Sequence, residues 1–183
     1  MRLEMRDFIS AFRRVFLLLP SAFILVYLIT GCGYKPTSVY TKKVLGEKIY
    51  SQVEVYLRDP ENAVLIKDAL NEAIVSRFKG SLVPKQYADS ELIVSLRGVS
   101  FRPLQYDKNG YVIYYRAITS LKIVYKSRKG ETKILTVSGN YDFPIEPNSV
   151  ISDTKRFEAI RESSKKALDK FISQISIIGY QES

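Results

Sequence analysis

Apolar and polar residues alternate in four segments of this chain, and a period of two predicts strands with one buried face. These segments are residues 49–57, 92–102, 111–126 and 135–141. We expect Pro103 to end the second strand, because proline cannot donate to a strand ladder. The third segment is expected to be the longest strand. Turn residues at 107–110 and 127–130 predict that the last three strands form an antiparallel meander.

Two other segments place apolar residues at steps of three and four, which is typical of helices with one buried face. The first runs from Pro60 to Phe78, with Asp59 in position to cap it and Gly80 in position to close it. The second runs from residue 153 to residue 178, and we expect Gly179 to stop it.

The predicted order of elements is β-α-β-β-β-α, which defines an α+β fold. We expect two helices packed on one face of a four-stranded, mostly antiparallel sheet. Residues 33–48 contain glycine, proline and threonine with little periodicity, so an extended and mobile tether is predicted there. Residues 49–183 are expected to form a single domain with its own hydrophobic core.

The segment before the tether has the layout of an export signal. Arginines come first, an apolar run from Val15 to Ile29 follows, and Thr30 and Gly31 precede Cys32, the single cysteine. This pattern predicts a lipoprotein signal peptide at residues 1–31 and a lipidated tether at residues 32–48 that starts with lipid, including palmitate, on Cys32. A retained membrane anchor is a weaker alternative, because the run is shorter than about 20 residues. A buried core cysteine would leave the arginines unexplained.

Composition limits the function classes. The chain has no histidine, and lipid on Cys32 would use its one thiol. The common general bases, nucleophiles and metal ligands are therefore missing, which predicts no catalytic residues, no metal, and no cofactor other than the covalent lipid. The net charge of +9 would favour nucleic acid in a cytosolic protein. In an exported lipoprotein it favours anionic lipids and phosphorylated glycolipids, so no nucleic-acid partner is predicted.

Cations and tyrosines gather along the second and third predicted strands and the turn between them. They are Arg97, Arg102, Tyr106, Lys108, Tyr111, Tyr114, Tyr115 and Arg116. Guanidinium and ammonium groups pair with phosphates, and tyrosine offers amphipathic surface to sugars or acyl chains. A binding site for a phosphorylated amphiphile is one interpretation. The other is ordinary strand composition, because tyrosine favours strands and arginine often lies on exposed faces.

The chain resembles the LPS-assembly lipoprotein family LptE. The resemblance lies in the Cys-Gly-Tyr start at residues 32–34, the short tether, the order of elements, the turn Lys108-Asn109-Gly110 before a long aromatic strand, and the final charged helix. It implies a non-enzymatic plug of the LptD β-barrel, lipid-anchored on the periplasmic side of the outer membrane, that aids assembly of the barrel and delivery of lipopolysaccharide. It also implies lipopolysaccharide-binding cations at Lys108 and Lys155.

Two other functions remain open at this stage. An auxiliary lipoprotein of an envelope transport or cell-wall synthesis machine would share the anchor and could share the fold. A basic module that binds nucleic acid would require the export signal to be misread.

Overall fold

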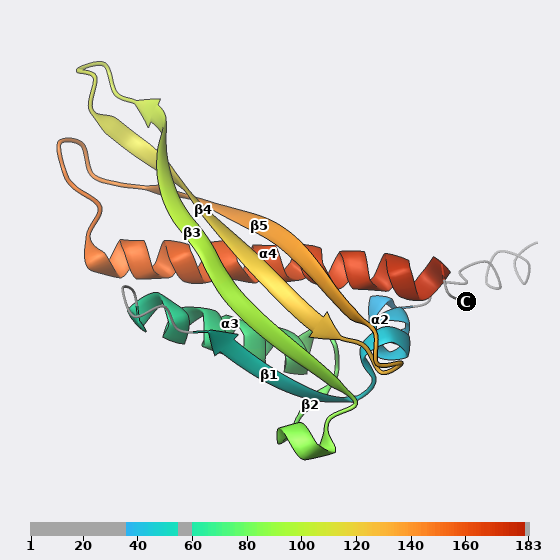
Figure 1. Cartoon of the computed structure of the whole chain (residues 1–183). Coiled ribbons are helices and arrows are strands. Elements are labelled where there is room, and N and C mark those ends of the chain that lie inside the picture. The colour runs from blue at the N-terminus through green and yellow to red at the C-terminus, as the bar shows by residue number, and fades with distance from the viewer. Residues whose placement is uncertain (1–35, 55–59, 182–183) are drawn as a thin grey trace, which may run out of the picture. The chain divides into compact units, whose positions relative to one another are not determined.

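The computed structural model describes residues 36–54 and 60–181, and these belong to a compact unit that begins at Pro36 (Figure 1). Its elements in chain order are α2 (Thr37–Leu45), β1 (Lys48–Glu54), α3 (Pro60–Ser76), β2 (Ser81–Leu82), the short 3₁₀ helix η1 (Lys85–Tyr87), β3 (Ser90–Tyr106), β4 (Val112–Lys126), β5 (Thr132–Pro144) and α4 (Asp153–Gln181). The predicted signal peptide and Cys32 lie outside the described residues.

The strands form one sheet in the order β2-β1-β3-β4-β5. Strands β3, β4 and β5 form the predicted antiparallel meander, whereas β1 pairs in parallel with both β3 and β2. The α+β class is confirmed. The predicted four strands and two helices are wrong in number, because the described residues form five strands and three α-helices. Strand β2 has only two residues, too few to show an alternation.

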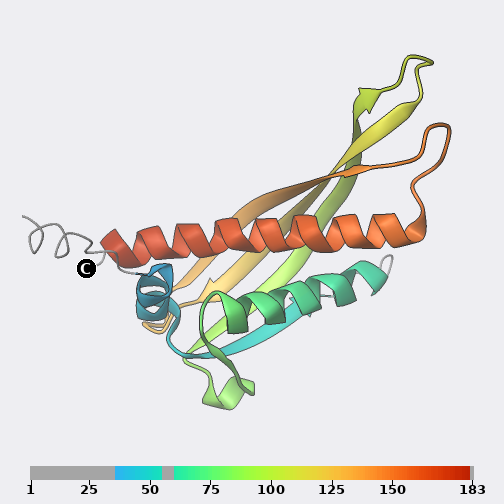
Figure 2. The same cartoon turned by 180° about the vertical axis from the view of Figure 1, so that it is seen from behind.

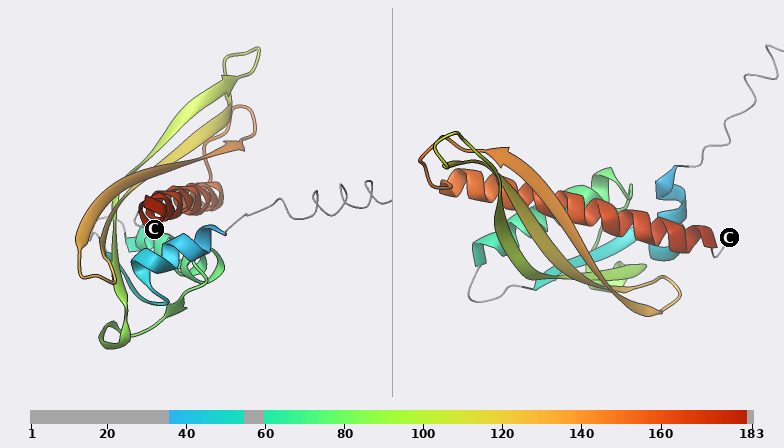
Figure 3. Two further views of the ribbon diagram at one scale, coloured as in Figure 1. Left: turned by 90° about the vertical axis from the view of Figure 1, so that its right-hand side faces the viewer. Right: turned by 90° about the horizontal axis from the view of Figure 1, so that it is seen from above.

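The helices cover one face of the sheet, as Figures 2 and 3 show from behind, from the side and from above. The core lies between that face and the helices. Its fully buried side chains include Leu121 and Tyr125 from β4 and Phe171 from α4. Apolar residues at every second strand position and at every third or fourth helix position meet there, so the periodicity read from the sequence is the cause of this packing.

The end of the second strand and the order of strand lengths differ from the prediction. Pro103 does not end the second strand, because β3 continues to Tyr106. Pro103 lies opposite Tyr115, and the register shifts between Pro103 and Gln105, so a bulge accommodates the missing N–H group. As a result β3, with 17 residues, is longer than β4, with 15, and the expectation that the third strand would be the longest is wrong.

The extended tether predicted over residues 33–48 is wrong from Thr37 to Leu45, where the chain forms α2. Packing against the end of α4 explains this helix. The Oγ1 of Thr41 lies 2.9 Å from the Oγ of Ser176, and both side chains are buried. The rings of Tyr40 and Tyr180 meet edge to face at 5.6 Å. Nine residues are too few for a stable isolated helix, so its stability comes from these tertiary contacts.

Gly179 does not stop the last helix, which continues to Gln181. Its role is close packing, because a Cβ atom at this position would lie 2.3 Å from the carbonyl oxygen of Tyr40. A glycine near the end of a helical pattern is an expected stop signal, but here the missing side chain allows α2 to approach.

We expect Gly179→Val to displace α2 and to lower the free energy of unfolding by about 1–3 kcal/mol, because the added atoms overlap the backbone of Tyr40. Hydrogen exchange measures this directly, as amides of residues 37–45 should lose protection while those of α3 keep theirs. The control is Gln174→Val, at an exposed position of the same helix. Unchanged protection of α2 in Gly179→Val would contradict the packing role.

Candidate functional site

The β3–β4 hairpin extends past the helices at one end of the unit (Figures 1 and 2). Most of the predicted cations and tyrosines, from Arg102 to Arg116, belong to this hairpin. Lys108 is exposed in the turn at the tip. The side chain of Asp107 fixes this turn, because its Oδ1 accepts hydrogen bonds from the N–H groups of Asn109 (2.9 Å) and Tyr111 (2.8 Å). Gly110 adopts a φ of +85°, which favours glycine. The tip therefore presents Lys108 on a well-defined turn.

Three aromatic side chains near this tip are exposed: Tyr106, Tyr111 and Tyr114. Leu104 is exposed beside them. Exposed aromatic and aliphatic side chains around a cation form an amphipathic surface, which fits the headgroup and the upper acyl region of a charged lipid.

Arg102 and Arg116 are opposite each other in the register of β3 and β4, on the face of the sheet away from the helices. Arg116 forms a two-pronged ion pair with Asp142, with both N···O distances 2.7 Å. The hydrogen bond from Arg116 lowers the pKa of Asp142, and the same contact raises the pKa of Arg116. Arg116 is therefore engaged within the protein, whereas Arg102 is exposed beside it.

Tyr115 lies on the opposite face from Arg116 and belongs to a second, smaller core. Its ring stacks on Phe143 at 6.3 Å, and Phe101 meets Phe143 edge to face at 6.2 Å. Tyr141 stacks on Phe143 as well, and desolvation raises its pKa. The predicted cations and tyrosines are thus divided between two faces of the sheet. We had not predicted this aromatic cluster, although Phe101 and Phe143 continue the apolar alternation of their strands.

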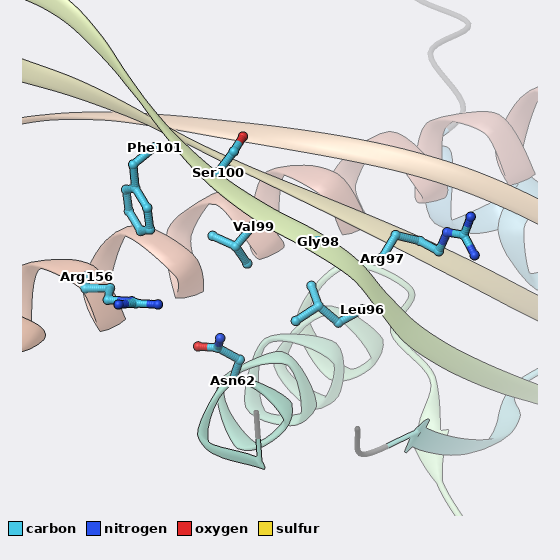
Figure 4. Close-up of a pocket in the computed structure, with 8 residues that line it drawn as sticks. All are labelled: Asn62, Leu96, Arg97, Gly98, Val99, Ser100, Phe101 and Arg156. Carbon is cyan, nitrogen blue, oxygen red and sulfur yellow. The ribbon is translucent and has the colours of Figure 1, made fainter. Parts of the chain in front are cut away.

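Arg97 lies in β3 where the register shifts between Leu96 and Gly98, and it borders an open groove of about 400 Å³ (Figure 4). The groove is lined by Asn62, Leu96, Arg97, Gly98, Val99, Ser100, Phe101 and Arg156. The guanidinium of Arg156 stands over the ring of Phe101, 5.9 Å from its centroid. Figure 4 shows Arg97 turned away from Arg156, so the two cations do not converge. Arg156 was not among the predicted site residues.

Lys155 lies in the first turn of α4, where its Nζ is 3.1 Å from the Oε2 of Glu158. A hydrogen bond from Lys155 lowers the pKa of Glu158. Lys155 also borders a second hollow of about 390 Å³, lined by Pro144, Ile145, Glu146, Ser149, Val150, Ser152 and Lys155. Val150 is 88% exposed, which is unusual for a valine. This hollow therefore combines a cation with accessible apolar surface.

Within residues 36–54 and 60–181, no group of three or more histidine, cysteine, aspartate or glutamate side chains is placed to hold a metal ion. No helix in the same part of the chain has the length and apolar character to span a membrane. The chemistry that the hairpin end offers is non-covalent binding, with Arg102, Lys108, Lys155 and Arg156 beside exposed aromatic and aliphatic groups.

The described residues form a small α+β module with cations and exposed aromatic side chains at one end. A family model described as LptE, Lipopolysaccharide-assembly, matches residues 50–175. The chain therefore belongs to the LptE family of lipopolysaccharide-assembly lipoproteins. No curated protein matches its sequence.

Two solved structures are similar to this chain at low sequence identity. A putative lipoprotein from Caulobacter crescentus is 11% identical with a TM-score of 0.52, and the match covers 80% of this chain and 97% of that one. The rare lipoprotein B from Shewanella oneidensis is 12% identical with a TM-score of 0.44, over 69% and 95% of the two chains. At these identities we take from the comparison only the similarity of fold to the Caulobacter crescentus protein.

Proposed function

We propose that this protein is an outer-membrane lipoprotein, anchored on the periplasmic side through lipid on Cys32. In this proposal it plugs the LptD β-barrel, helps the barrel to assemble, and aids delivery of lipopolysaccharide to the cell surface without catalysing a reaction. The observation that carries the proposal is the family match over residues 50–175, which spans β1 through most of α4.

The geometry of the hairpin end supports lipopolysaccharide as a ligand. Phosphorylated lipid requires cations beside apolar surface, and Arg102 and Lys108 lie with exposed tyrosines on and near one hairpin. Lys155 supplies a further cation at the start of α4, although its ammonium group forms an ion pair with Glu158. Arg97 stays in the proposed set as an exposed cation in the middle of β3. Arg116 is the weakest member, because its guanidinium is occupied by Asp142.

The test is to extract the lipidated protein from its native envelope in mild detergent and to identify by mass spectrometry any large protein that co-purifies. We expect an outer-membrane β-barrel in near-equal amount. Recovery of an inner-membrane transporter or a cell-wall synthase instead would replace the plug with an auxiliary role in another envelope machine. A parallel preparation of Cys32→Ala, labelled with a radioactive fatty acid, checks the anchor, because lipid labelling and membrane attachment that both persist unchanged would contradict lipidation at Cys32.

We expect Arg102→Glu combined with Lys108→Asp to weaken lipopolysaccharide binding by about tenfold or more, because two charge-assisted contacts to phosphate become repulsive. Titration with fluorescent lipopolysaccharide at matched ionic strength measures the effect. The control is Lys67→Asp with Lys170→Glu, which makes the same change of net charge at exposed positions on α3 and α4. Equal losses of affinity in the two double variants would show that only the net charge matters, and would contradict a binding site at the hairpin.

A further inference from the structure

A second group of cations lies at the other end of β4, where α2, the start of β1 and the β4–β5 turn meet (Figures 1 and 2). The segments are joined by backbone hydrogen bonds, since the N–H of Arg128 donates to the carbonyl oxygen of Val44 over 2.9 Å. We call this group the anchor-end cluster. Its cations are Lys42, Lys43, Lys48, Lys126, Arg128, Lys129 and Lys133.

Three carboxylates lie among these seven cations, and each has a local partner. A fourth, Glu91, lies opposite Lys126 in the register of β3 and β4 and pairs with Lys85, outside the cluster, at 3.0 Å. Glu47 pairs with Lys42 at 2.9 Å and Glu131 pairs with Lys133 at 3.2 Å. Asp89 accepts hydrogen bonds from the backbone N–H groups of Glu47 and Lys48. The cluster thus carries an excess of four positive charges. Residues 36–183 carry a net charge of +6, so most of the net positive charge of the unit is concentrated in the cluster.

The cluster is accessible and structurally fixed. Five of its cations are exposed: Lys43, Lys48, Lys126, Arg128 and Lys129. The β4–β5 turn is closed by a hydrogen bond from the N–H of Ser127 to the carbonyl oxygen of Glu131. Helix α2 is held to α4 by the buried contact between Thr41 and Ser176. The charges therefore belong to an ordered surface.

Covalent geometry places this surface near the predicted lipid. Four peptide steps separate Cys32 from Pro36, so their Cα atoms are at most about 15 Å apart whatever path the chain takes. Strand β4 separates Lys126 from Val112 at the hairpin end by about 45 Å, from the usual rise per residue. The anchor-end cluster is consequently the end of the unit that a lipid on Cys32 would hold against a bilayer.

We propose that the anchor-end cluster binds the anionic phospholipid head groups of the bilayer that holds the lipid on Cys32. Lysine and arginine next to an anionic membrane are attracted to its surface potential, and a lipid chain with a polybasic patch anchors more firmly than the chain alone. Helix α2 and the β4–β5 turn then lie at the membrane surface, and the tip of the β3–β4 hairpin lies farther from the head groups than the turn does. The proposal rests on lipid attachment at Cys32, but not on the LptD partner.

The experiment uses the mature lipidated protein in vesicles of phosphatidylcholine, alone or with about 30% phosphatidylglycerol, a mixture with a strongly negative surface. A fluorophore is attached at Thr132→Cys beside the β4–β5 turn, or at Asn109→Cys at the hairpin tip, both of which are exposed. Energy transfer to a headgroup-labelled lipid reports the distance of each site from the surface. We expect transfer from position 132 to rise at least twofold with phosphatidylglycerol, and transfer from position 109 not to rise.

Two double variants, one in the cluster and one outside it, test the role of the cluster. Lys126→Glu with Lys129→Glu should abolish the rise at position 132, whereas Lys67→Glu with Lys170→Glu, the same change of net charge outside the cluster, should keep it. Salt at about 0.5 M should also abolish the rise, because it shortens the screening length to a few ångström. Circular dichroism verifies that each variant is folded. Equal transfer in the two lipid mixtures, or equal loss in the two double variants, would overturn the proposal.

The outcome for the anchor is read separately. Protein that leaves both kinds of vesicle at high salt lacks the lipid, and this would contradict attachment at Cys32. In that case, retention at low salt on phosphatidylglycerol vesicles alone would still support the cluster, and no retention would overturn it. A third set of vesicles contains lipopolysaccharide in place of phosphatidylglycerol. If energy transfer from position 132 rises with lipopolysaccharide but not with phosphatidylglycerol, the assignment to phospholipid head groups is overturned.

Discussion

Replacing Phe171 with alanine should lower the free energy of unfolding by about 4 kcal/mol, the largest loss we expect from one side chain. Phe171 is fully buried near the middle of the core. Its ring meets Phe78 of the segment after α3 at 6.2 Å and Tyr125 of β4 at 5.8 Å, both edge to face. The substitution removes two aromatic contacts and leaves a cavity between the sheet and both long helices.

Urea denaturation followed by circular dichroism measures this loss, provided that the slope of the unfolding free energy against urea concentration stays unchanged. Ile177→Ala is the control, because Ile177 lies on the same helix but is 57% exposed, and it should cost less than about 1 kcal/mol. If Phe171→Ala cost no more than Ile177→Ala, the contact of α4 with α3 and β4 would not be the main support of the core.

Gly139→Ala should lower the free energy of unfolding by about 3 kcal/mol, although it adds a single methyl group. A Cβ atom at residue 139 would lie 2.0 Å from the carbonyl oxygen of Ser163 and 2.3 Å from the nitrogen of Ala167. Both are backbone atoms, so relief requires α4 to move away from β5. That movement would also disturb the buried hydrogen bond between Thr119 and Ser163, whose oxygens are 2.6 Å apart.

A melting curve compares this variant with Gly98→Ala, a substitution of the same size in β3. No heavy atom lies within 4 Å of a Cβ atom at Gly98, so its stability should change by no more than about 0.5 kcal/mol. Similar melting temperatures for the two variants would show that β5 and α4 do not need the close approach at Gly139.

The long elements could be predicted from sequence because each carries its own periodic pattern. Pro60 starts α3 as expected, and Asp153 starts α4. The alternation of Ala117, Thr119, Leu121, Ile123 and Tyr125 correctly gave the buried face of β4. These patterns are local, and the hydrophobic core forms when the apolar faces of these strands and helices pack together.

The features that could not be predicted depend on contacts between distant residues. Helix α2 has only three buried residues, Thr41, Val44 and Leu45, and it is helical because the end of α4 supports it. Gly179 was interpreted as a stop signal because a glycine at the end of a helix and a glycine under a second helix look the same in one sequence. Pro103 was misjudged because the bulge that accommodates it is set by pairing with β4.

The candidate site was predicted in composition but not in arrangement. The sequence placed Arg102, Lys108 and Arg116 near one hairpin, and the structure agrees. The pairing of Arg116 with Asp142 depends on the register between β4 and β5, which no local pattern specified. Arg156 was missed because its contact with Phe101 joins α4 to β3 across more than fifty residues of chain.

The position of α4 after all the strands in chain order affects the timing of folding. Strands β3, β4 and β5 can pair as soon as they are adjacent, but Leu168, Phe171 and Ile175 of the core come from the last thirty residues. Contacts between segments far apart in the chain form late, since a long loop must close first. A chain that is exported from its N-terminus would therefore complete its core only after α4 has crossed the membrane.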